Sequence, residues 1–202
     1  MIGEMLQWLD YFGTAVFAVS GALVASRQRM DLMGFLILAM VTGIGGGTLR
    51  DLLLDRPVFW LTQWEYLVIA AVMAIATFFA TRPFQERFNW LLWADAVGLA
   101  AFCVIGTQIA LSMDASPMIA VMMGIITPAF GGLIRDVLAG EPPLLLHREI
   151  YASAALVGGI VYVLFAHWLG WPIAAVILGF TVTLVVRGLG IRYHWHLPSA
   201  NG

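Results

Sequence analysis

The chain has 202 residues, of which 61% are hydrophobic and only 11% are charged. A soluble domain carries about 25% charged residues, so this chain lacks the charge to cover a water-exposed surface and is expected to be solvated mainly by lipid. The formal net charge of −2, with arginine as the only strongly basic residue type, excludes the basic surface that a nucleic-acid partner requires.

Seven segments are apolar for long enough to cross a bilayer, which takes roughly 20 helical residues. In chain order, the sequence predicts spans at 8–25, 32–54, 66–80, 91–111, 117–138, 150–169 and 172–186. The third span is short but can be extended through Leu61. We therefore expect an all-α membrane protein that forms a single transmembrane domain over residues 1–202.

Arginines gather on one side of this predicted bundle. Those that follow spans one, three, five and seven fall on the same side, whereas Arg56 lies on the opposite side with several acidic residues. The first group comprises Arg27, Arg29, Arg82, Arg87, Arg148, Arg187 and Arg192. Because cytoplasmic loops carry the excess of basic residues, this pattern predicts an outside N-terminus and a short cytoplasmic tail at 187–202.

The chain also matches itself at an offset of 85 residues. Residues 10–57 align without gaps on 95–142, and the motif Gly-Gly-x-x-Arg-Asp occurs in both copies, at 46–51 and at 131–136. Each copy holds three spans, an odd number, so the second copy must enter the membrane from the other side. This predicts an inverted 3+3 helix repeat, with repeat one at about 8–80 and repeat two at about 91–169. A seventh helix, at about 172–186, lies outside the repeat.

Spans two and five carry matching clusters that weaken a helix. The first is Thr42-Gly43-Ile44-Gly45-Gly46-Gly47, and the second is Thr127-Pro128-Ala129-Phe130-Gly131-Gly132. Glycine costs roughly 1 kcal/mol in a helix interior and proline about 3 kcal/mol, so local unwinding or a kink is expected in both spans. Freed carbonyls would then face a wet path suited to a partly dehydrated monovalent cation. The alternative is that the glycines only permit close helix packing. Candidates for a polar lining of the path are Ser20, Thr42, Thr48 and Thr127.

One helical turn beyond each cluster lies an Arg-Asp pair inside the predicted span. Charges within a span are costly and usually find partners, but neighbours in sequence do not face each other on a helix. Matching depth instead predicts two ion pairs, Asp10–Arg50 and Asp95–Arg135, that would tie the first helix of each copy to its glycine-containing helix. A double-mutant cycle tests such pairing.

Two alternatives for these charges stay open. Asp51 and Asp136 would attract cations in the water path, or Asp10 and Asp95 would be solvated carboxylates at helix starts. No residues in the sequence pair a nucleophile with a base or gather as metal ligands, so neither an enzyme nor a cofactor or metal site is predicted.

Segments 10–23, 42–51, 131–136 and 191–198 resemble the prokaryotic trimeric intracellular cation (TRIC) channel family, which is also labelled a glycine-transporter-domain family. The resemblance covers essentially the whole chain. It implies seven helices, a symmetric homotrimer, and an hourglass pore within each protomer that conducts monovalent cations with a preference for K⁺. The permeant ion would then be K⁺ or Na⁺.

The family's glycine kinks map onto positions 45–47 and 131–132 of this sequence. Repeat two has Phe130 where repeat one has Gly45, so the two half-pores should differ, and Phe130 is a candidate hydrophobic element of the gate. The lysine-based lipid-binding motif of the animal members has no counterpart in a chain without lysine. A passive cation channel in a bacterial inner membrane is the first interpretation. The alternative is a secondary transporter of a small solute such as glycine, because inverted repeats with broken helices also serve alternating access.

Overall fold

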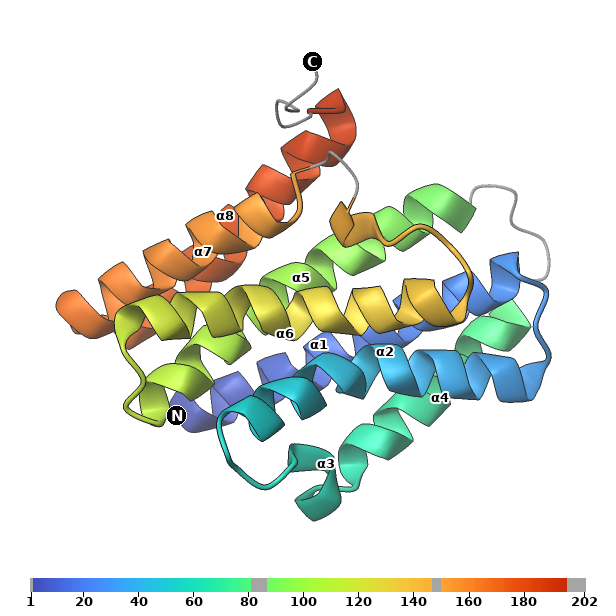
Figure 1. The fold of residues 1–202 in the computed structure, drawn as a ribbon, viewed down its shortest axis with the longest axis horizontal. Coiled ribbons are helices and arrows are strands. Elements are labelled where there is room, and N and C mark those ends of the chain that lie inside the picture. Colours follow the sequence, from blue (N-terminus) through green and yellow to red (C-terminus); the bar gives the residue numbers. More distant parts are fainter. Residues whose placement is uncertain (1, 81–86, 147–149, 196–202) are drawn as a thin grey trace.

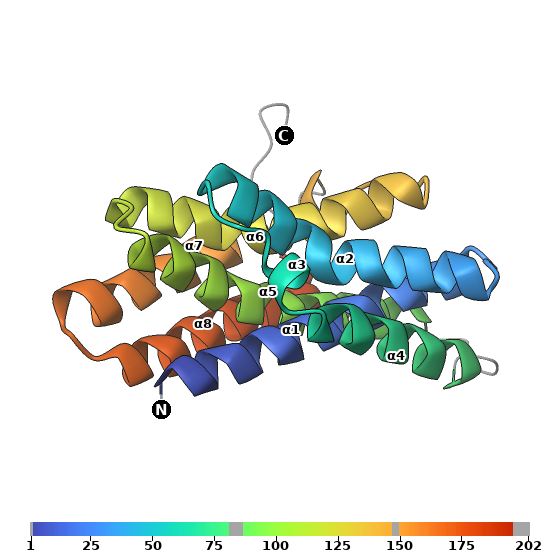
Figure 2. The same ribbon diagram turned by 90° about the horizontal axis from the view of Figure 1, so that it is seen from below.

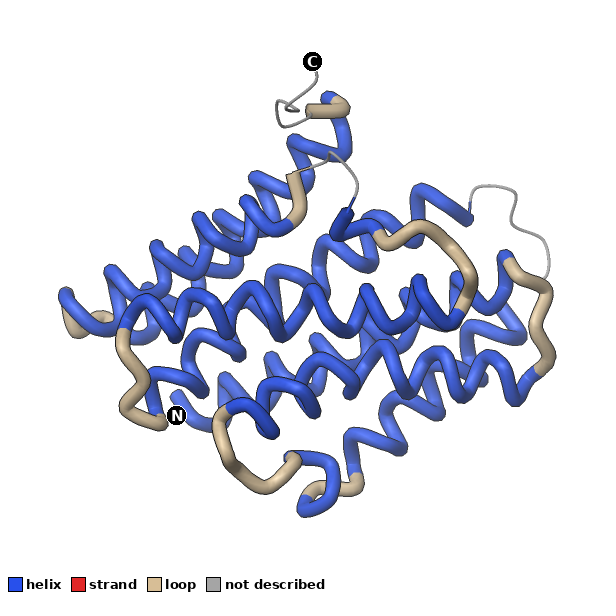
Figure 3. Tube along the Cα trace, in the orientation of Figure 1, coloured by secondary structure: helices blue, strands red, loops and turns tan. Residues whose placement is uncertain are grey.

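The computed structural model describes residues 2–80, 87–146 and 150–195. In this part of the chain every regular element is a helix (Figures 1 and 3). The longer helices are α1 (Ile2–Arg27), α2 (Leu32–Leu53), α4 (Glu65–Ala80), α5 (Arg87–Ser112), α6 (Pro117–Leu138), α7 (Ala152–Val163) and α8 (Pro172–Tyr193). The shorter ones are α3 (Phe59–Thr62), a 3-10 turn η1 (Leu144–Leu146) and a π-helical turn η2 (Leu164–Trp168). The prediction of an all-α protein is confirmed.

Five of these helices are long and apolar enough to cross a membrane, namely α1, α2, α5, α6 and α8. The third and sixth predicted spans correspond to α4 and to α7 with η2, which are apolar but shorter. Two helices extend beyond the predicted spans, since α1 begins at Ile2 and α8 continues to Tyr193. Hydrogen bonding continues a helix beyond its apolar run, so residues 187–193 of the predicted tail are helical. Arg82, Arg148 and residues 196–202 lie outside the described residues.

Helices α1 and α5 form the centre of the bundle. Helix α1 packs against α2, α4 and α5, while α5 packs against α6, α7 and α8. Helices α2 and α6 lie against each other as well as against α1 and α5 (Figures 1 and 2). Large apolar side chains remain exposed on the outer helix faces, as expected for a surface in contact with lipid. Examples are Trp8, Met33, Phe79, Met118 and Ile177.

The structure relates residues that are 85 positions apart, the same offset as in the sequence. The Phe17 and Phe102 rings, which are equivalent in the two copies, contact each other with centroids 5.1 Å apart. The backbone repeats as well, since the residues with positive φ include the equivalent pairs Arg29 and Asp114, and Asp55 and Gly140. The two copies therefore share turn geometry in addition to sequence.

Gly140 provides a clean test of one of these turns. Its φ is +68°, and a Cβ built on it would meet nothing within 4 Å, so alanine there would be opposed only by the backbone. We expect Gly140→Ala to lower the free energy of unfolding by about 1 kcal/mol, measured by SDS titration of the purified protein. The control is Gly3→Ala, which also meets nothing but lies in α1, and which is expected to be neutral or stabilising. Equal stability of Gly140→Ala and wild type would contradict the turn geometry.

Candidate functional site

Each copy of the Arg-Asp motif forms the same local ion pair. The Arg50 Nε donates to Asp51 Oδ1 at 2.8 Å, and the Arg135 Nε donates to Asp136 Oδ1 at 2.7 Å. The prediction that these neighbours would not pair was wrong. Their Cβ atoms do diverge on the helix, but the arginine side chain is long enough to fold back across the helix surface.

The second oxygen of each aspartate holds the chain that follows the helix. Asp51 Oδ2 accepts a hydrogen bond from the backbone N–H of Phe59 at 2.9 Å, and Asp136 Oδ2 accepts one from Leu144 at 2.8 Å. Both carboxylates are buried and both of their oxygens are bound within the protein. This role argues against Asp51 and Asp136 as free cation-attracting groups. In both copies the aspartate lies eight residues before its backbone partner, and this equal spacing is the one sign of the contact in the sequence.

In repeat two the arginine has direct partners on other helices, although its Nη2 has no hydrogen-bond partner among the described residues. The Arg135 Nη1 donates to Asp95 Oδ1 at 2.7 Å and to the Ser20 hydroxyl, and the Arg135 side chain is fully buried. The predicted Asp95–Arg135 ion pair is confirmed. Asp95 is likewise buried rather than a solvated carboxylate at a helix start. The Ser20 hydroxyl accepts a hydrogen bond from the Arg135 guanidinium and is not a free lining group.

In repeat one the corresponding groups stand apart around a pocket of about 350 Å³, which we call the Arg50 pocket. Asp10 Oδ2 accepts a hydrogen bond from the Tyr66 hydroxyl at 3.0 Å, and no ion pair joins Asp10 to Arg50. Asp10 Oδ1 and both terminal nitrogens of Arg50 are buried without a hydrogen-bond partner among the described residues. The predicted Asp10–Arg50 pair was therefore wrong, and the one side-chain partner of Asp10 among the described residues is the Tyr66 hydroxyl.

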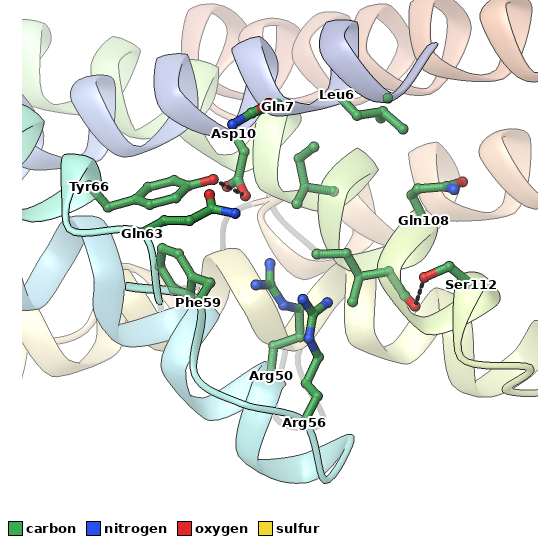
Figure 4. Close-up of a pocket in the computed structure, with 13 residues that line it drawn as sticks. Leu6, Gln7, Asp10, Arg50, Arg56, Phe59, Gln63, Tyr66, Gln108 and Ser112 are labelled. Carbon is green, nitrogen blue, oxygen red and sulfur yellow. Dashed lines mark hydrogen bonds between the residues drawn. The ribbon is translucent and has the colours of Figure 1, made fainter. Parts of the chain in front are cut away.

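Figure 4 shows Asp10 and Arg50 reaching into this pocket from α1 and α2, with Tyr66 and Phe59 beside them. Arg56 also lines the pocket, and its Nε lies 3.6 Å from Asp51 Oδ1. Polar amides and a hydroxyl complete the lining, contributed by Gln7, Gln63, Gln108 and Ser112. Since Gln7, Gln63 and Ser112 are exposed, the pocket opens at this end of the bundle.

A second pocket, of about 320 Å³, lies at the opposite ends of α1 and α5. We call it the Glu141 pocket, because Glu141 accepts hydrogen bonds from Arg27 at 3.2 Å and from Gln28 at 2.8 Å. Several of its lining residues are the repeat equivalents of residues in the Arg50 pocket. These pairs are Leu6 and Leu91, Arg56 and Glu141, Phe59 and Leu144, and Ser112 and Arg27.

The glycine clusters lie where α2 and α6 touch. A Cβ on Gly46 would sit 1.8 Å from the Thr127 carbonyl oxygen, and a Cβ on Gly131 would sit 2.8 Å from the Thr42 carbonyl oxygen. These two contacts are repeat equivalents of each other. Small residues thus let the two helix backbones approach closely, as the packing alternative proposed.

Both clusters lie within continuous helix, Leu32–Leu53 and Pro117–Leu138. The expected unwinding is therefore not observed. Pro128 lies inside α6, and Gly43, Gly45, Gly47 and Gly132 lie within the two helices without interrupting them. A kink in α2 or α6 stays a prediction.

The candidate lining hydroxyls are all bonded within the protein. Thr42 and Thr127 are buried and donate to the carbonyls of Leu38 and Met123, one turn back in their own helices. Thr48 donates to Ile44 and accepts from Trp60 Nε1 at 2.9 Å. Phe130 is half-buried, as is Gly45 at the equivalent position.

Comparison with known proteins places this arrangement in a family. A family model described as "Glycine transporter" matches residues 7–82 and again 92–167, two matches separated by the same offset of 85 residues. The UPF0126 inner membrane protein YadS of Escherichia coli strain K12 is 46% identical over 198 residues, which is 96% of each chain. A TRIC trimeric intracellular cation channel orthologue from Rhodobacter sphaeroides has a structure with a TM-score of 0.92 and 44% identity, covering 95% of this chain and 99% of that one. The chain belongs to the TRIC family.

A second solved TRIC structure agrees with this assignment. A prokaryotic TRIC channel in 0.5 M KCl has a TM-score of 0.88 and 30% identity, covering 96% of this chain and 99% of that one. The TRIC chain described here is accordingly a membrane protein with transmembrane helices, and the resemblance predicted from its motifs is confirmed.

Sequence reasoning missed two features of this TRIC chain. Tyr66 binds Asp10, and Ile105 takes the position in repeat two that Ser20 has in repeat one. The second feature could have been found in the alignment of 10–57 on 95–142, where a serine aligns with an isoleucine. Because isoleucine has no hydroxyl, the two arginines cannot have the same hydrogen-bond partners.

Proposed function

We propose that this protein is a monovalent cation channel that prefers K⁺ and has its pore within each protomer. The observation that carries the proposal is the match of nearly the whole chain to solved TRIC cation channels. The two pockets support it further, since each is lined by charged side chains and they lie at opposite ends of α1 and α5, as the mouths of an hourglass would.

We further propose that the pore lies at the interface of an inverted 3+3 repeat, with seven spans in all. The reciprocal contacts of Gly46 with Thr127 and of Gly131 with Thr42 support a two-fold relation between α2 and α6. Close-packed glycines are also the residues at which helices bend with least steric cost. Kinking of α2 and α6 there would release the hydroxyls of Thr42 and Thr127 to line a path between the pockets, with Thr48 and Ser20 nearby and Phe130 at its narrow part.

The assembly and orientation belong to the same proposal. A homotrimer in the inner membrane is supported by the similarity to a trimeric TRIC channel and to the inner membrane protein YadS. An outside N-terminus and a cytoplasmic C-terminus rest on the distribution of arginines between the two sides. Arg27, the last residue of α1, and Arg29, in the turn that follows, lie at the end that this orientation places inside.

Secondary transport of a small solute such as glycine is the second candidate. It is favoured by the description of the family model that matches both repeats. Inverted repeats support alternating access as readily as a channel, so the fold alone does not choose between them.

Planar-bilayer recording of the purified protein separates the two candidates. A channel is expected to give unitary currents whose reversal potential, in a tenfold KCl gradient, approaches the value of about 59 mV for an ideal cation-selective pore. Replacing KCl by NaCl on one side then measures the preference for K⁺. A mock purification from cells that lack the gene is the control. Saturable exchange of labelled glycine in proteoliposomes, without unitary currents, would instead establish the transporter.

A further inference from the structure

The two pockets carry opposite charges at equivalent positions of the repeat. Arg56 lines the Arg50 pocket, and Glu141, the residue 85 positions later, lines the Glu141 pocket. The side chains of Arg56 and Glu141 are 30% and 17% exposed, so each reaches solvent. The two repeats thus place a positive group at one end of α1 and α5 and a negative group at the other.

The other charged lining residues agree with this difference. Among the described residues, two arginines and one aspartate line the Arg50 pocket, whereas one arginine and two acidic residues line the Glu141 pocket. The first three are Arg50, Arg56 and Asp10 (Figure 4), and the second three are Arg27, Asp136 and Glu141. The lining of the first pocket is therefore positive overall, and that of the second is negative.

The difference persists when the buried neighbours of the lining residues are included. Asp51 bonds Arg50 and brings the first pocket to neutrality. Behind the second pocket, Arg135 bonds both Asp136 and Asp95, and because Arg135 and Asp95 have opposite charges, the two together add none. With or without these neighbours, the second pocket is negative relative to the first.

Charges at the mouth of a narrow path change the local concentration of permeant ions. Low-dielectric walls focus the field of the lining charges, and a cleft of one sign concentrates ions of the opposite sign. A unit charge that acts across several ångströms of water changes the concentration of a monovalent cation about two- to threefold. Cations in equal solutions would therefore enter the path more often from the Glu141 pocket than from the Arg50 pocket.

We infer that Arg56 and Glu141 make the cation current directional, so that at equal and opposite voltages more cations pass from the Glu141 pocket to the Arg50 pocket than the reverse. The inference rests on the proposed channel function, and in the proposed orientation the larger current is outward. Exposed arginines on the inner side, such as Arg192, do not line the Glu141 pocket, and salt screens exposed charges more strongly than lining ones. The lining charges, and not the surface excess of arginine, set the direction.

Single-channel recording of the purified protein, with the same KCl concentration on both sides of a planar bilayer, tests the inference. In about 0.1 M KCl, the currents of one channel at equal and opposite voltages are expected to differ about twofold or more. In about 1 M KCl, where the screening length falls to about 3 Å, the ratio of the two currents should approach one. A ratio of one in the dilute solution, or the same ratio in both solutions, would overturn the inference.

The variant Ser112→Cys identifies which way each channel is inserted. Ser112 is exposed and lines the Arg50 pocket, whereas the natural Cys103 is buried, so wild type is the control for the labelling. A membrane-impermeant thiol reagent with a sulfonate group, added to the side of the Arg50 pocket, should raise the current that enters there. A reagent of similar size with an ammonium group should lower it. The same response to both reagents would indicate a steric effect and overturn the electrostatic origin.

Charge variants assign the effect to the two residues. Arg56→Gln should raise the current that enters from the Arg50 pocket about twofold, and Glu141→Gln should lower the current that enters from the Glu141 pocket about twofold. The exchange Arg56→Glu/Glu141→Arg should reverse the preferred direction, and if this double variant does not fold, the two single variants decide. Arg192→Gln and Asp31→Asn are the matched controls, because each removes one exposed charge that lines neither pocket.

The current ratio should stay at the wild-type value in both controls. Changes in the controls as large as those in Arg56→Gln and Glu141→Gln would overturn the assignment to these two residues. Unitary currents of equal size in both directions would overturn the inference and leave the channel function standing. The absence of any unitary current from wild type would instead overturn the channel function, and the inference with it.

Discussion

Replacing Asp95 by alanine is expected to lower the free energy of unfolding by about 3–5 kcal/mol, because the change leaves a buried guanidinium without its interhelical partner. Arg135 and Asp95 are both fully buried, and their atoms lie 2.7 Å apart. Asp136 alone would then balance Arg135, while its other oxygen still holds the Leu144 amide. SDS titration of the purified protein, followed by circular dichroism, measures the effect.

The equivalent substitution in repeat one provides the control. Asp10 has no ion pair and bonds only the Tyr66 hydroxyl, so Asp10→Ala should cost about 1–2 kcal/mol. The ratio between the two aspartates is therefore the sensitive quantity. Equal losses at Asp10 and Asp95 would contradict the difference between the buried Asp95–Arg135 ion pair and the Asp10–Tyr66 hydrogen bond.

A double-mutant cycle isolates the ion pair itself. Arg135→Met removes the charge and keeps an apolar side chain of similar length, so the double variant Asp95→Ala/Arg135→Met should be less destabilised than the sum of the single changes. We expect a coupling energy of about 1–3 kcal/mol. Strict additivity would show that the two residues do not interact in the folded protein.

The sequence predicts the helices well because the bilayer leaves few alternatives. Apolar runs of about 20 residues with few charges can only be spanning helices or the core of a large protein. The short elements α3 and the π-helical turn η2 were not predicted. They lie at the ends of apolar runs, where packing and not hydropathy determines the backbone.

Side-chain partners were predicted less well, because depth in the membrane does not determine which of several nearby groups forms the hydrogen bond or ion pair. Asp95 bonds Arg135 as matching depth predicted, yet Asp10, at the equivalent position, bonds Tyr66. The rule that neighbours on a helix do not meet also failed for Arg50 and Asp51, since it describes Cβ directions and not the reach of a guanidinium.

The glycine clusters show a second limit of sequence reasoning. A run of glycines weakens a helix in isolation, but it also permits a neighbouring backbone to approach and thereby gains packing energy. The contact of Gly46 with the Thr127 carbonyl shows that the second effect prevails. Only the partner helix, which the local sequence does not reveal, distinguishes the two outcomes.

Gly46→Ala is accordingly expected to lower the free energy of unfolding by about 3 kcal/mol, the upper part of the range for overpacking in a rigid core. The new Cβ would lie 1.8 Å from the Thr127 carbonyl oxygen, so α2 and α6 must move apart and lose contacts along their length. Because the obstacle is backbone, no side-chain rotation relieves it. The measurement is again SDS titration.

Gly45→Ala is the matched control, one residue earlier in the same helix. Its Cβ would meet only the Ile134 Cδ1 at 3.4 Å and the Val41 Cγ1 at 3.9 Å, which is ordinary van der Waals contact. Alanine is the better helix former by about 1 kcal/mol, so this variant should be as stable as wild type or more stable. If both variants lost similar stability, the glycines would be required for a backbone conformation and not for the α2–α6 contact. A loss confined to Gly46→Ala follows only if the helix interface is what demands glycine.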